Sequence, residues 1–80
     1  MKTAAIRHLA ETQTPASLAA AEQALLHGRP PAIEVAGASA GEQLTHVLAA
    51  QFVLDYRQAH GVGVAAAVRA FSVRVRQSIS

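Results

Sequence analysis

The sequence contains no cysteine and no tryptophan, and only 15% of its 80 residues are charged. Without cysteine the chain has no disulfide, zinc–thiolate or iron–sulfur site and no thiol nucleophile. It also lacks an apolar run of the roughly 18 residues that a membrane-spanning helix needs. The opening residues Met1, Lys2 and Thr3 lack the apolar core of a signal peptide, so we expect a cytoplasmic protein without membrane association.

Eighty residues are enough for one domain, and we expect a single helical domain over residues 1–80. The hydrophobic fraction is 51%, but 19 of these residues are alanine and three are aromatic. Alanine favours helix strongly and buries little apolar area. In so small a domain the gain from apolar burial barely offsets the conformational entropy, so self-association is the expected additional source of stability.

Helix-start and helix-stop residues divide the chain into helical segments. The expected helices are Thr3–Thr12, Pro15–His27, Ala40–Ala59 and Val64–Ile79. Thr14 before Pro15 is a typical N-cap, and Ser39 with Glu42 has the spacing of a capping box. Glycines 28 and 61 follow the second and third segments, where left-handed C-caps are favoured.

Residues 29–38 contain two consecutive prolines, Pro30 and Pro31, which cannot continue a helix. Ile33 and Val35 alternate with Glu34, so we expect this segment to be extended and to lie across the helices. The predicted fold is therefore all-α, a small bundle of three to four helices with an extended Pro-rich connector.

The longest predicted helix carries large apolar side chains around most of its circumference. Such a helix is buried on more than one side, and the short remaining segments are expected to cover one broad face. A second copy of the chain is the simplest cover for the rest, and a twofold dimer is the commonest arrangement. The alternative is a monomer that wraps this helix with its own N-terminal helices and connector. The residues expected at this interface are Leu48, Phe52, Val53, Tyr56 and Val73.

Glu42 and His46 are the weak candidates for metal ligands. Their i, i+4 spacing places them on one face of a helix. Two ligands do not make a site, and Glu42 has a complete alternative role as the capping-box acid. We therefore expect no bound metal, and a His/Glu metal site stays open as one alternative function.

From Arg57 to the C-terminus the chain has four arginines and no acid. We expect Arg57, Arg69 and Arg76 to contact an anion or an acidic protein partner. A nucleic-acid-binding accessory that uses the Arg-rich last helix is a second alternative. Against it, that helix opens with Val64 and three alanines instead of base-reading polar side chains, and the net charge is only +2.

The residues do not predict an enzyme or a bound cofactor. The five acids lack the spacing of a general acid–base pair, and the glycines do not form a phosphate-binding loop. The function predicted from the residues is a homo-oligomeric protein-interaction module without catalytic activity.

Three stretches, MKTAAIRHLAE, GEQLTHVLAAQFVL and AFSVRVRQSIS, resemble a family of short uncharacterised bacterial proteins found mainly in Bacteroidetes. The likeness spans nearly the whole chain, although the connector with its two prolines is less similar. It implies a small helical unit of unknown function and transfers no catalytic residues. Some members are encoded beside thioredoxin-like or peroxiredoxin genes, which implies a thiol-redox protein as a partner.

Overall fold

The computed structural model describes residues 2–79, and the side chains of residues 2–78. Within these residues the chain forms four α-helices and no strand, which confirms the all-α prediction. The helices are α1 (Thr3–Thr12), α2 (Pro15–Leu26), α3 (Ala40–His60) and α4 (Val64–Ile79). Each bound agrees with the sequence prediction to within one residue.

Helix α2 is closed at both ends by local hydrogen bonds. The Thr14 hydroxyl accepts from the Ser17 N–H at 3.1 Å, and the Ser17 hydroxyl accepts from the Thr14 N–H at 3.0 Å. At the other end Gly28 has a φ of +70°, and the Arg29 N–H donates to the Ala24 carbonyl at 2.8 Å. This is a Schellman turn, which only glycine enters without a steric penalty.

The start of α3 differs from the predicted capping box. Ser39 Oγ accepts from the Glu42 N–H at 3.2 Å, as expected. The Glu42 carboxylate, however, accepts from the Ala38 N–H at 3.2 Å instead of from Ser39. Because the carboxylate reaches one residue further back, it fastens the end of the connector to the first turn of α3.

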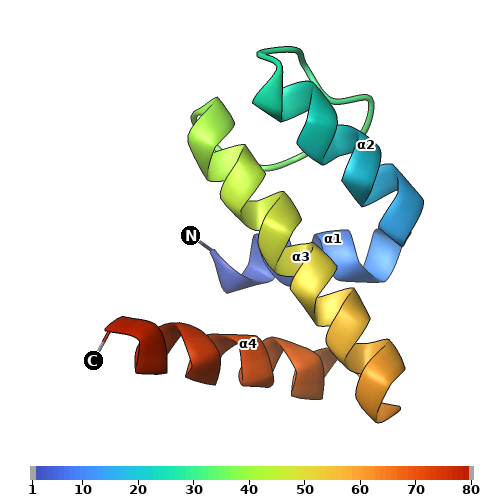
Figure 1. The fold of residues 1–80 in the computed structure, drawn as a ribbon, viewed down its shortest axis with the longest axis vertical. Helices are drawn as coiled ribbons and strands as arrows, with labels where there is room; N and C mark the ends of the chain where they lie inside the picture. Colours follow the sequence, from blue (N-terminus) through green and yellow to red (C-terminus); the bar gives the residue numbers. More distant parts are fainter. Residues whose placement is uncertain (1, 80) are drawn as a thin grey trace.

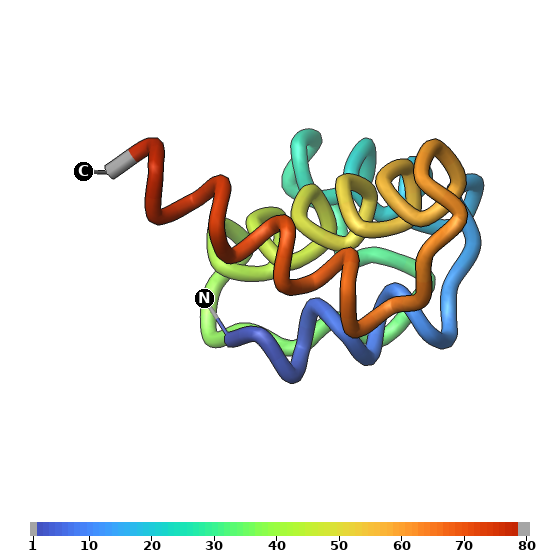
Figure 2. The backbone as a smooth tube through the Cα atoms, turned by 90° about the horizontal axis from the view of Figure 1, so that it is seen from below, coloured from blue at the N-terminus to red at the C-terminus, as the bar shows by residue number. Residues whose placement is uncertain are grey.

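Helix α3 lies at the centre, and α1, α2 and α4 all pack against it (Figure 1). Helix α2 lies alongside α3, while α1 crosses it on the other side and α4 returns roughly antiparallel to α1. The C-terminal half of α4 extends past the other helices (Figure 2). The result is flat, with principal extents of 32 × 28 × 17 Å.

Two apolar clusters hold these helices together. One lies among α1, α2, α3 and the connector, and its buried members are Leu9, Leu18, Ala21, Leu25, Val35, Val47 and Ala50. The other joins α1, α3 and α4 through Ile6, Ala10, Ala49, Val53, Ala67 and Val68. The alanines let the helices approach closely, and Val35 of the connector completes the first cluster. Three helices therefore cover α3, more than the sequence analysis expected.

Candidate functional site

His46 on α3 is almost fully buried, with 1% of its surface exposed. Its Nδ1 lies 2.8 Å from the Ala36 carbonyl oxygen, and its Nε2 accepts from the Lys2 backbone N–H at 3.1 Å. A backbone N–H can only donate, so the ring proton must be on Nδ1, which donates to Ala36. His46 therefore joins the start of α1 and the end of the connector to α3.

This geometry leaves neither ring nitrogen of His46 free for a metal, because both already have backbone partners. Glu42 is likewise engaged with the Ala38 N–H. Across the described part of the chain, no three His, Asp or Glu side chains gather into a possible metal site. The arrangement shows a structural role for Glu42 and His46. The role of His46 was missed because its partners are backbone groups from distant segments, which side-chain spacing does not reveal.

A stripe of large apolar side chains crosses from α3 to α4. Leu48, Phe52 and Tyr56 follow one another at i, i+4 spacing on α3. The Phe52 ring is 6.1 Å from Tyr56 and 5.6 Å from Phe71 of α4, centroid to centroid. Leu48 is 45% exposed, and the three aromatic residues are partly exposed. We call Leu48, Phe52, Tyr56 and Phe71 the α3–α4 face.

Two charged residues lie at the edges of this face. The Arg74 guanidinium carbon is 5.5 Å from the centre of the Phe52 ring, which is a cation–π distance. Arg74 was not among the predicted site residues, because sequence spacing does not show which side chain of α4 reaches a ring on α3. Asp55 is exposed and lies three residues after Phe52, so it borders the same side of α3.

The structure separates the five predicted interface residues. Leu48, Phe52 and Tyr56 belong to the α3–α4 face, but Val53 is fully buried in the cluster between α1, α3 and α4. The expectation that Val53 meets a second copy is therefore wrong, because the chain's own helices cover it. Val73 is 47% exposed, yet it is two residues from Phe71 and so about 200° around α4 from it.

The three predicted partner-binding arginines do not form one patch. Arg69 and Arg76 are exposed and lie seven residues apart on one side of α4. Arg57 is half-buried on α3, where it lines a hollow with Pro15 at the start of α2.

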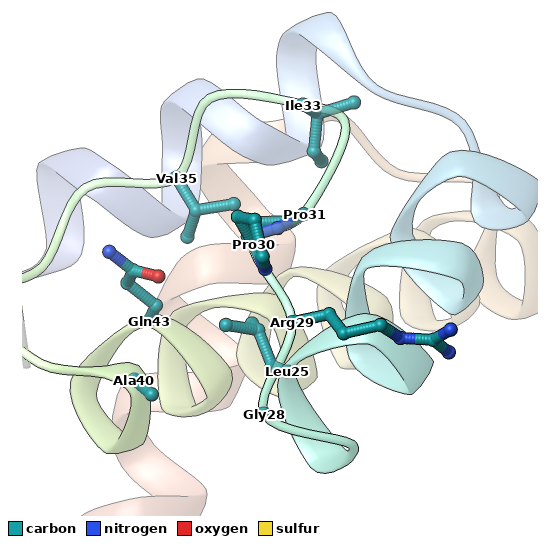
Figure 3. A pocket seen from close by; sticks show the side chains of 9 residues that line it. All are labelled: Leu25, Gly28, Arg29, Pro30, Pro31, Ile33, Val35, Ala40 and Gln43. Carbon is teal, nitrogen blue, oxygen red and sulfur yellow. The ribbon is translucent and has the colours of Figure 1, made fainter.

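A second hollow, of about 380 Å³, lies between the connector and the ends of α2 and α3 (Figure 3). Leu25, Pro31, Ile33 and Val35 make most of its wall apolar. Figure 3 shows the Arg29 guanidinium extending to the side opposite Val35. The nearby Gln43 amide donates to the Gly37 carbonyl at 3.2 Å. Arg29 and Gln43 are the polar side chains that line this hollow, and the Gln43 amide is already bonded to Gly37.

No helix in residues 2–79 is long and apolar enough to cross a membrane. No curated protein and no solved structure matches this chain. One family model does match, and it spans residues 1–80. The chain thus belongs to this family of unknown function, DUF6952.

Proposed function

We propose that the protein is a non-catalytic helical module that pairs with a second copy through the α3–α4 face and presents its arginines to an acidic protein partner. The observation that carries this proposal is the stripe from Leu48 to Phe71 across two neighbouring helices. Partly exposed aromatic rings beside an exposed leucine are typical of the centre of a protein–protein interface.

The size of the molecule supports this proposal. The chain exposes 4998 Å², whereas a monomer of this mass typically exposes about 4,600 Å². A stable interface buries about 800 Å² on each partner, roughly one sixth of the exposed surface. Helix α3 has 21 residues and is about 31 Å long, so its outer side offers the length that such an interface requires.

Charge also favours a second copy over an unrelated apolar partner. A twofold interface presents the same surface from both subunits, so it is most favourable when that surface carries both signs of charge. The α3–α4 face has Asp55 at one edge and Arg74 at another. In a twofold pair, Asp55 of each copy can approach an arginine of the other.

The test compares two leucine-to-glutamate variants. Leu48→Glu places a charge in the α3–α4 face, and Leu26→Glu places the same charge on a 56% exposed leucine at the end of α2. We expect the wild type and Leu26→Glu to elute as dimers with matching light-scattering masses, and Leu48→Glu to elute as a folded monomer. Equal masses for all three proteins, or dissociation of both variants, would contradict the proposal.

A nucleic-acid-binding accessory is the second candidate, and one observation favours it. Helix α4 carries Arg69, Arg74 and Arg76 and no acid. If α4 binds phosphates, the double variant Arg69→Ala/Arg76→Ala should weaken binding to a DNA duplex and reduce its salt dependence by about two phosphate contacts. Absence of wild-type binding at low salt would eliminate this candidate.

A further inference from the structure

Arg57 has an unusual environment for an arginine near a helix end. Its Nε is shielded from solvent and has no hydrogen-bond partner among the described residues. The side chain lines a hollow of about 300 Å³ between the start of α2 and the C-terminal half of α3. Pro15, Leu54 and Val62 form the apolar part of that wall.

The chain's own acids do not satisfy this guanidinium. Among the described side chains, Glu11 forms an ion pair with Arg7 on α1, at 3.3 Å, and not with Arg57. Glu22 accepts a hydrogen bond from the Gln51 amide at 3.0 Å. A charged donor without an acceptor is costly to shield. Nε itself is closed to solvent, so a ligand in the hollow would contact the part of the Arg57 side chain that lines it, where no protein partner has to be displaced.

We propose that this hollow binds a monocarboxylate with a short apolar tail, and that Arg57 is its anchor. A guanidinium presents its N–H groups as a planar fork that matches the two oxygens of a carboxylate. The apolar walls take the tail, and about 300 Å³ lies at the small end of ligand sites, which suits a tail of a few carbons.

The surroundings favour a single negative charge over a polyanion. Glu22 and Asp55 line an adjoining hollow that shares Pro15 and Leu54 with the first. The last-turn carbonyls of α3 add the negative end of the helix dipole. Both repel any anion, and they repel a phosphate dianion more strongly than a monocarboxylate. Because Arg57 lies outside the α3–α4 face, carboxylate binding at this site can be tested independently of the proposed self-association.

The test is a titration of the ¹⁵N-labelled protein, followed by NMR at constant pH and ionic strength. The probes are 3-methylbutanoate, its neutral analogue 3-methylbutanamide, and inorganic phosphate. We expect the carboxylate to shift the Arg57 Nε–H resonance and the amides of Gln58, Gly61 and Val62, with a Kd on the order of millimolar for so small a ligand. The amide and inorganic phosphate should shift these signals at least tenfold less than the carboxylate does.

Three variants assign the response to Arg57. Arg57→Gln should weaken carboxylate binding at least tenfold, and Arg57→Lys should weaken it less, because it keeps the charge and loses the fork. Arg29→Gln removes the same charge from an exposed site in the connector and should bind like the wild type. The proposal is overturned if the carboxylate causes no local shifts, if the amide binds equally well, or if Arg57→Gln binds like the wild type. If Arg57→Gln does not fold, the comparison of acid with amide on the wild type still decides.

Discussion

Replacing His46 with leucine removes two hydrogen bonds from the interior while keeping a side chain of similar size. The imidazole joins Ala36 of the connector to Lys2 at the start of α1. In the variant, the Lys2 N–H and the Ala36 carbonyl lose their partners. If these bonds stabilise the fold, the substitution must be destabilising despite the greater hydrophobicity of leucine.

The expected magnitude follows from two bonds at about 1 kcal/mol each, a total of about 2 kcal/mol. For a domain of this size that corresponds to a fall in Tm of about 8–16 °C. His46→Ala also leaves a cavity at a site with 1% exposure, which adds about 2 kcal/mol. The predicted order of stability is therefore wild type, then His46→Leu, then His46→Ala.

Thermal and urea unfolding followed by circular dichroism measures both losses. All proteins are compared at one concentration, because self-association would make Tm concentration-dependent. His8→Leu is the matched control, since His8 is exposed on α1 and the change should stay within about 0.5 kcal/mol. A His46→Leu variant as stable as the wild type would show that water or leucine packing replaces both bonds, and would refute the structural role.

Three further substitutions test local features by the same unfolding measurements. Gly37→Ala should destabilise by about 1–3 kcal/mol, because Gly37 has a φ of +146° and an added Cβ would lie 2.9 Å from Gln43 Cγ. The control is Gly41→Ala in the first turn of α3, where the nearest atom to the added Cβ is Ser39 Oγ at 3.9 Å, and this change should be near neutral or stabilising. Equal effects at the two glycines would contradict this. Ser39→Ala should cost about 1 kcal/mol by removing the N-cap of α3, and no loss would mean that water caps the helix equally well. Val53→Ala should cost about 2 kcal/mol because Val53 is fully buried, whereas a loss below about 0.5 kcal/mol would show that the site is not close-packed.

The helices could be predicted from the sequence because their ends depend on local chemistry. The start of α2 is determined by Thr14 and Pro15, and its end by Gly28. Both ends depend on hydrogen bonds that span only a few residues. Such signals are readable without any knowledge of the tertiary structure. Of the capping box predicted at α3, the bond to the Ser39 hydroxyl is confirmed and the bond from the Glu42 carboxylate to the Ser39 N–H is wrong. A carboxylate can reach either of two neighbouring N–H groups, and sequence spacing does not decide between them.

The packing around α3 could not be predicted in the same way. A helical wheel shows that Val53 and Leu48 are both apolar, but not which of them the chain's own helices cover. Tertiary packing decides this: α1 and α4 bury Val53, while Leu48 stays 45% exposed. The hollow at Arg57 was missed for a related reason, since Arg57 and Pro15 line one hollow only when α2 packs along α3.

The surface available to a second copy differs from the one predicted from the sequence. Three helices pack against the central helix, so less of it is uncovered than the sequence predicted. What remains is the narrower α3–α4 face, on which Phe52 contacts both Tyr56 and Phe71. The proposed pairing therefore depends on Leu48 and on three partly exposed aromatic rings.

Sedimentation equilibrium of the wild-type protein over a wide concentration range tests that pairing most directly. If the chain pairs, the mass should rise reversibly toward twice the chain mass of 8.3 kDa as concentration increases. A single 8.3 kDa species at every concentration would contradict it.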